Sequence, residues 1–292
     1  MKPAAFDYVR AESVAHAAQI LAGAGSDGKV IAGGQSLMPM MNFRLVKPSV
    51  LVDINAIAGL DHVELNGSRL RIGALVRHFM TACDPIIAQH APIVTEAMKH
   101  VAHLTVRNRG TFCGSVCHAD PAAEMPMMTV LLDGRIHAVS TRGMRIIPIG
   151  EFFAGSLVTS LEPDELVTTV DLATTGREMG YGFHEFARRH GDYALAAVAV
   201  LMRREAGKAR DVRIAVMGVG EMPSRVPAAE EVIEGNELCD AAILRATESL
   251  RTAISPNSDL NASADYRRHL AGALAGRAIR DAWSRAREAV PA

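Results

Sequence analysis

Two stretches of the chain combine glycines, a helix start and polar side chains in a pattern that suits phosphate binding. In the first, residues 29–55, the apolar run Val30–Ala32 ends in Gly33-Gly34. Ser36 follows as a candidate N-cap, because its hydroxyl can accept a hydrogen bond from a first-turn N–H. Pro39 then falls in the first helical turn, where its missing N–H costs little. Glycines admit a ligand close to the backbone, and free N–H groups at a helix start attract an anion.

The second stretch, residues 106–124, reads V-R-N-R-G-T-F-C-G-S-V-C-H-A-D-P-A-A-E. Two such turns in one chain can enclose an extended ligand from two sides, and a phosphate or pyrophosphate is the group expected at such a turn. Taken alone, each motif also fits a tight strand–helix turn that binds nothing. Arg107 and Arg109 fit either pairing with phosphate or plain exposure to solvent.

Two acids follow the second glycine turn. Asp120 and Glu124 can each accept hydrogen bonds from ribose hydroxyls or an adenine amine, a role that acids play in other dinucleotide sites. Both also suit the start of a helix, which can begin at Asp120-Pro121 or nearer Glu124. Pro126 argues against a helix that runs unbroken from Asp120 to Leu132.

No catalytic or metal-binding constellation stands out. Cys113, Cys117 and His118 have no second ligand pair elsewhere, so packed thiols fit better than a metal site. His100 and His103 have no visible acid or nucleophile beside them, and we interpret both as structural. We therefore predict no catalytic residue and no metal ligand on this chain.

Bulk composition excludes several classes of protein. The 292 residues are 49% hydrophobic but only 4% aromatic, so Ala, Val, Leu and Met must fill the core. The net charge of −1 argues against a nucleic-acid partner or an anionic membrane surface. The sequence also lacks a membrane-length apolar run and a signal-like N-terminus, and a cytoplasmic location is expected.

The elements that position these motifs divide at residue 176 into an N-terminal and a C-terminal part. Residues 177–292 are expected to form an α+β domain with a three-stranded antiparallel sheet. The expected strands of the first part are Phe6–Val9, Val30–Ala32, Val50–Ile54, Gly59–Leu65, Arg69–Gly73, further strands within 129–149, and one within 161–172. Its expected helices are Ser13–Ala22, Val76–Cys83 and Pro85–His100. The second part is expected to contain strands Gly182–Phe186, Ala194–Met202 and Val212–Val219, then helices around 227–234, 238–254 and 263–288, the last capped by Ser263.

At this level of detail the sequence resembles a known family. The runs A-G-G-Q-S-L-M-P-M-M and R-N-R-G-T-x-x-G-S-x-x-H-A-D-P-A-A-E, followed by Gly191-Asp192-Tyr193-Ala194, are similar to the FAD-binding medium subunits of the molybdenum hydroxylases. That family includes the medium subunits of aerobic carbon monoxide dehydrogenase, quinoline oxidoreductase and bacterial xanthine dehydrogenases. The likeness extends to the S-A-D-Y-R-R run at 263–268 and covers nearly the whole chain, with the motifs in order.

The resemblance implies that residues 1–176 are an FAD-binding domain of the vanillyl-alcohol-oxidase type with two α/β subdomains. It also implies a site made from both stretches. Ala32–Leu37 and Thr111–Ser115 would enclose the pyrophosphate, and Glu124, with Asp120 as a second acid, would take the ribose and adenine. Tyr193 would lie near the isoalloxazine ring. Leu161 and Val167 are core residues by default, and the resemblance places one of them near the flavin or adenine. The cofactor-binding residues predicted in this way are Ala32, Gly33, Gly34, Gln35, Ser36, Leu37, Val101, Thr111, Gly114, Ser115, Asp120, Glu124, Leu161, Val167 and Tyr193.

The resemblance also implies partners. Electrons would arrive from [2Fe-2S] clusters on a small subunit and leave the flavin for NAD, a quinone or oxygen as external acceptor. Substrate oxidation would occur at a molybdenum cofactor on a large subunit, and the trimer would pair into a heterohexamer. The H-V-A-H-L-T-V-R-N-R-G-T run looks most like the N-heterocycle hydroxylases. The alternative is a self-sufficient FAD oxidase or dehydrogenase.

One position departs from the family pattern. The family usually has Gly-Gly in the second turn, where this chain has Cys113-Gly114. A Cβ at Cys113 is expected to crowd a close phosphate contact unless the backbone there is ordinary or the loop has shifted.

Overall fold

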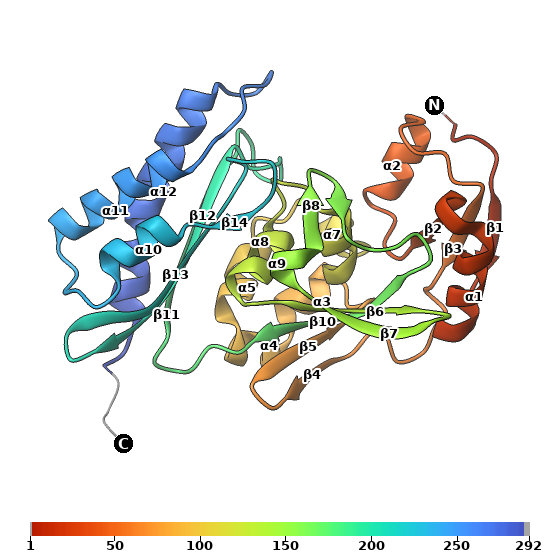
Figure 1. Ribbon diagram of the computed structural model, residues 1–292, viewed down its shortest axis with the longest axis horizontal. Coiled ribbons are helices and arrows are strands. Elements are labelled where there is room, and N and C mark those ends of the chain that lie inside the picture. The colour runs from red at the N-terminus through yellow and green to blue at the C-terminus, as the bar shows by residue number, and fades with distance from the viewer. Residues whose placement is uncertain (1, 289–292) are drawn as a thin grey trace.

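The computed structural model describes residues 2–288 and shows three bodies side by side (Figure 1). A small parallel sheet with α1 and α2 lies at the N-terminal end. A five-stranded sheet with a group of helices lies in the middle. A long antiparallel sheet, covered on its outer face by α10, α11 and α12, lies at the C-terminal end. The arrangement confirms the predicted fold class.

The first body is a three-stranded parallel sheet in the order β1-β3-β2. Its elements are β1 (Asp7–Arg10), α1 (Val14–Ala24), the 3-10 turn η1 (Gly25–Asp27), β2 (Gly28–Ile31), α2 (Leu37–Asn42) and β3 (Val50–Asp53). Ser13 caps α1 by accepting a hydrogen bond from the backbone N–H of His16 at 3.1 Å. Because parallel strands end at one sheet edge, the chain leaves β2 and β3 at adjacent points.

The second body is an antiparallel sheet in the order β4-β5-β10-β6-β7. Its strands are β4 (Val63–Asn66), β5 (Arg69–Gly73), β6 (Arg135–Ser140), β7 (Gly143–Pro148) and β10 (Leu166–Ala173). Helices and one small hairpin accompany it: α3 (His78–Cys83), α4 (Pro85–His90), α5 (Pro92–Met98), α6 (Leu104–Arg107), α7 (Phe112–His118), α8 (Glu124–Leu131), α9 (Ile149–Phe152), β8 (Phe153–Gly155) and β9 (Val158–Thr159).

Two expected elements of this body are corrected. The strand expected at the start of 129–149 is instead the end of α8, which is buried almost all round, so its apolar run carries no helical period. The helix expected over Pro85–His100 is divided at Ala91, because Pro92 begins a new helix, α5.

The third body contains the three expected strands and one more. The sheet order is β11 (Gly180–Phe186), β12 (Ala196–Glu205), β13 (Lys208–Met217) and the two-residue edge strand β14 (Ser224–Arg225). The helices are α10 (Pro227–Ile233), α11 (Asp240–Ala253) and α12 (Ala264–Arg285). Ser263 caps α12 by accepting a hydrogen bond from the backbone N–H of Tyr266 at 3.2 Å, as expected.

The two faces of β12 join two cores. Val198 and Val200 face the helices α10–α12, whereas Ala197, Ala199 and Leu201 pack with the apolar core of the N-terminal part. This alternation follows from the two-residue period of a strand. The C-terminal sheet is therefore packed directly against the rest of the chain.

Arg267, inside the S-A-D-Y-R-R run, fixes α12 to this sheet. Its buried guanidinium donates to the Leu195 carbonyl at 2.7 Å, to the Gly218 carbonyl at 2.9 Å and to the Asp259 carboxylate at 2.9 Å. The backbone N–H of Gly218 in turn donates to the Pro121 carbonyl at 2.8 Å. The C-terminal sheet is thereby bonded to the loop that carries Asp120.

No helix within residues 2–288 is both long enough and apolar enough to cross a membrane.

Candidate functional site

The first glycine turn lies between β2 and α2. Gly34 has φ +70°, a backbone conformation that favours glycine, and a Cβ there would meet the Ile31 and Met38 side chains at 3.2 and 3.3 Å. Within the described chain, the backbone N–H groups of Gly33, Gly34, Gln35 and Ser36 donate no hydrogen bond to protein. The turn therefore presents a row of free donors to a ligand.

Ser36 does not cap α2 as expected. Its backbone is helical, with φ −100° and ψ −44°, and its hydroxyl accepts no bond from the first turn. An N-cap side chain needs an extended backbone to reach back to those N–H groups. The first-turn donors are therefore not occupied by the Ser36 side chain.

The two glycine turns touch each other. A Cβ added to Gly33 would lie 2.3 Å from the carbonyl oxygen of Arg109 and 2.7 Å from the Cα of Gly110. Only a residue without a side chain allows this approach. The predicted juxtaposition of the two stretches is confirmed.

The second turn is held more tightly by protein than the first. Thr111 caps α7, because its hydroxyl accepts a hydrogen bond from the Gly114 N–H at 3.1 Å. The Arg107 guanidinium bonds to protein, because its Nη1 donates to the carbonyls of Val101 and Ala102 at 2.8 and 3.0 Å. Arg109 is exposed.

Cys113 fits this turn with an ordinary backbone. It lies in α7 without a positive φ, is buried, and its thiol is 3.4 Å from the Ile72 carbonyl oxygen. Burial raises the pKa of the Cys113 thiol well above its usual range and that of Cys117 to about 12. Both thiols stay protonated, and the prediction that Cys113 packs inside the turn is confirmed.

Asp120 and Glu124 occupy different local positions. Asp120 accepts a hydrogen bond from the Ala122 N–H at 2.9 Å and caps no helix, because α8 begins at Glu124. Glu124 is half-buried in the first turn of α8. Burial raises the pKa of Glu124 to about 7, and the charge of Asp120 adds to this. The chain therefore holds a carboxyl there that is only partly exposed to solvent.

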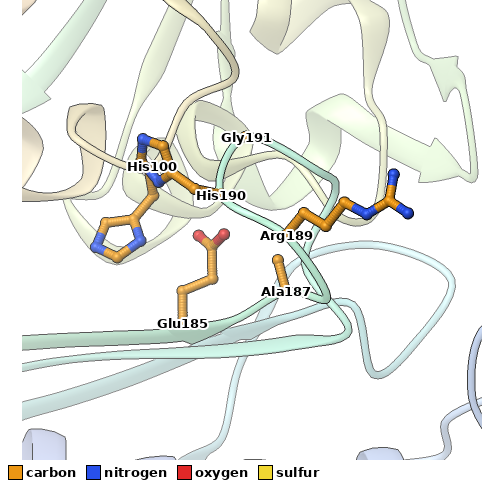
Figure 2. A pocket seen from close by; sticks show the side chains of 6 residues that line it. All are labelled: His100, Glu185, Ala187, Arg189, His190 and Gly191. Atoms are coloured by element: carbon orange, nitrogen blue, oxygen red, sulfur yellow. The ribbon is translucent and has the colours of Figure 1, made fainter.

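A second acid, Glu185, lies beside this group and was missed from the sequence. Glu185 is on β11 and lines a cavity of about 100 Å³ with His100, His190 and Gly191. Figure 2 shows its carboxylate pointing toward the histidine side of this cavity, whereas the Arg189 side chain extends away. Its Oε2 atom is buried and has no partner within the described residues. Burial, with the Glu124 charge as the smaller cause, raises the pKa of Glu185 to about 8.

Tyr193 lies on the loop between β11 and β12. Gly191 has φ +86° and packs on His103, where a Cβ would be 2.6 Å from the imidazole Cε1. Partial burial raises the pKa of Tyr193 to about 12, and the charges of Asp120 and Glu124 add to this rise. The residue is nevertheless 62% exposed.

Three predicted site residues are part of the apolar core. Val101 and Val167 are buried, and Leu161 packs against the same core. Val167 pairs with Ala138 in the ladder between β10 and β6. Their predicted contact with a ligand stays a prediction.

Two further side chains, Asn55 and Arg77, were missed from the sequence and bond to both turns. Asn55 follows β3, at the sheet edge where β2 leads into the first glycine turn, so its position after an apolar strand was a usable signal. Arg77 offered no such signal, because it follows an antiparallel strand and pairs with Thr111 only in the folded chain.

Comparison with known proteins agrees with this architecture. Residues 4–174 match the family model of the FAD binding domain in molybdopterin dehydrogenase, and residues 181–282 match that of the CO dehydrogenase flavoprotein C-terminal domain. Two similar relatives are from Paenarthrobacter nicotinovorans. One is the 6-hydroxypseudooxynicotine dehydrogenase complex subunit alpha, 40% identical over 98% of this chain and 97% of the relative. The other is the nicotine 6-hydroxylase medium subunit, 40% identical over 98% of this chain and 100% of the relative.

A solved structure shows the same fold over nearly the whole chain. It is the carbon monoxide dehydrogenase from Hydrogenophaga pseudoflava that lacks the Mo-pyranopterin moiety. The TM-score is 0.96 with 33% sequence identity, over 98% of this chain and 100% of that chain. The fold and both matched domains define an FAD-containing oxidoreductase subunit. The chain belongs to the family of FAD-binding medium subunits of the molybdenum hydroxylases.

Proposed function

We propose that this chain holds one FAD between its two glycine turns and relays electrons through it within a molybdenum hydroxylase complex. The observation that carries the proposal is the contact of Gly33 with Arg109 and Gly110, beside a row of free N–H groups from Gly33 to Ser36. A pyrophosphate needs such donors and a close backbone. The residues present therefore fit the group.

Different residues of the site would contact different parts of the dinucleotide. Ala32–Leu37 and Thr111–Ser115 would hold the pyrophosphate, and Glu124 and Asp120 would accept hydrogen bonds from the ribose and adenine. The Tyr193 loop would lie over the flavin, with Leu161, Val167 and Val101 forming apolar walls. When bound, FAD takes up single electrons and passes on pairs; the chain supplies binding, orientation and electrostatics.

The names of the relatives support the proposed partners and substrate. Medium subunits imply a small subunit with [2Fe-2S] clusters and a large subunit with the molybdenum cofactor, paired into a dimer of heterotrimers with an external electron acceptor. We take the cytoplasm as the location. Because a relative at 40% identity is named for nicotine hydroxylation, an aromatic N-heterocycle is the proposed substrate of the complex.

We expect FAD binding to become tighter as pH rises from about 6 to about 8. Without ligand, the raised pKa of Glu124, about 7, keeps much of this carboxyl protonated at neutral pH. Hydroxyl donors of the ribose favour the carboxylate form, so FAD binding expels a proton and is easier where the proton is already lost. Glu124→Gln should weaken FAD by about 1.5–3 kcal/mol above pH 7 and flatten the pH dependence.

Fluorescence titration of FAD into apoprotein at several pH values checks this. Glu151→Gln is the matched control, because Glu151 is an exposed first-turn glutamate of α9. An unchanged dissociation constant for Glu124→Gln would leave Glu124 as a plain helix-start residue.

The FAD should be noncovalent and present at one per chain. Cys113 is the nearest candidate for a covalent link in the second turn, but its thiol is buried and protonated. Acid precipitation of the purified yellow chain should therefore release all the flavin into the supernatant. A yellow precipitate would contradict noncovalent binding, and a chain that binds no added FAD would contradict the proposed function.

A further inference from the structure

Asn55 and Arg77 lie outside both glycine turns, yet they bond to the backbone of both. The Asn55 Nδ2 donates to the Ala32 carbonyl at 2.8 Å, directly before the first turn. The Arg77 Nη1 donates to the Arg109 carbonyl at 2.5 Å, directly before Gly110. The Arg77 Nη2 donates to the Asn55 Oδ1 at 2.5 Å. Three hydrogen bonds therefore run without interruption from one turn to the other.

Both residues are themselves held in place by further hydrogen bonds. The Asp53 Oδ1 accepts from the Asn55 Nδ2 at 2.6 Å and from the Asn55 backbone N–H at 2.8 Å, and the Tyr8 hydroxyl donates to the other oxygen of Asp53. On the opposite side, Arg77 forms a backbone bridge with Thr111. Asn55 is therefore held by the end of β3, and Arg77 by its place in the segment after β5.

The turns need such a link because no sheet joins them. The first turn leaves the parallel sheet β1-β3-β2, whereas the second packs beside the separate sheet β4-β5-β10-β6-β7. Within the described residues, no strand ladder crosses between these two sheets. Side-chain contacts, which include the apolar core shared by both sheets, must then set the separation of the turns, and the contact at Gly33 leaves little tolerance for change.

We propose that Asn55 and Arg77 form a clamp that sets the distance between the two glycine turns and so positions the phosphate-binding N–H groups. The proposal rests on the proposed function, since the turns are taken to hold the FAD pyrophosphate. Both are positioning residues: their hydrogen-bonding groups are directed at protein atoms, and they act on the ligand through the backbone.

The test is FAD affinity in Asn55→Ala, Arg77→Met and the double variant. Each single variant should bind FAD about tenfold more weakly, the effect expected for a lost hydrogen bond of this kind. The double variant should be little weaker than either single one, because the three bonds form one chain. Arg69→Met is the matched control: Arg69 also donates to two backbone carbonyls, those of Asp133 and Asp171, but neither belongs to a glycine turn.

A second readout separates positioning from general loosening. The affinity for ADP, obtained from displacement of bound FAD, should fall in parallel with the affinity for FAD. The affinity for adenosine, which has no phosphate, should be unchanged. Should Arg77→Met fail to fold, Arg77→Lys provides the test, since one ammonium group lacks the fork that reaches both acceptors. Wild-type FAD affinity in folded Asn55→Ala and Arg77→Lys would overturn the clamp. A wild-type chain that binds no FAD would instead overturn the proposed function.

Discussion

Replacing Gly33 by Ala is expected to give a folded chain that purifies without FAD. The added Cβ would lie 2.3 Å from the Arg109 carbonyl oxygen and 2.7 Å from the Gly110 Cα. These are backbone atoms, so no flexible side chain can move aside, and the two turns must separate. Because the proposed pyrophosphate site consists of both turns, a small separation removes donors from the ligand on one side. The visible flavin spectrum of the purified variant measures the loss.

Gly23→Ala is the matched control for this substitution. Gly23 is an exposed glycine inside α1, and a Cβ there meets nothing within 4 Å. Alanine also favours a helix, so this variant should fold at least as well and keep its flavin. Full flavin occupancy in folded Gly33→Ala would show that the two turns do not jointly hold the cofactor.

The sequence was informative wherever local chemistry decides the structure. The strand, glycine turn and helix around Gly33 are present, as are the caps Ser13 and Ser263, because a turn or a cap depends on a few adjacent residues. Ser36 was wrong as a cap because its backbone is helical, a property that the residue type does not fix. The run before Leu132 was wrong as a strand because a fully buried helix has no apolar face to detect.

The parts that sequence could not predict are contacts between distant segments. Arg77 donates hydrogen bonds to Arg109 and to Asn55, which lie on different bodies of the fold. No spacing of residues in the sequence predicts these bonds. Glu185 lies on β11, far along the chain from Glu124, yet the charge of Glu124 acts on it. The domain boundary at residue 176 stays a prediction, as do the ligand contacts of the predicted site residues.

The isolated chain carries two acids that could serve as a catalytic base. The carboxyls of Glu124 and Glu185, with their raised pKa values, are the feature that a self-sufficient oxidase would use as a base. However, the cavity beside Glu185 has a volume of only about 100 Å³. Sites for small organic molecules are typically about 300–1,000 Å³. We therefore expect no oxidation of an organic substrate by this chain alone.

The most direct test of the account follows the flavin absorbance of the FAD-loaded chain under anaerobic conditions, with a panel of alcohols, aldehydes and N-heterocycles. The flavin should stay oxidised with the isolated chain, and it should bleach once the proposed small iron–sulfur and large molybdenum subunits are added with their substrate. Glu185→Gln should leave this bleaching in place, since the acid takes no part in substrate oxidation. Bleaching of the isolated chain by any organic compound, and its loss in Glu185→Gln, would contradict the account and identify a self-sufficient oxidase.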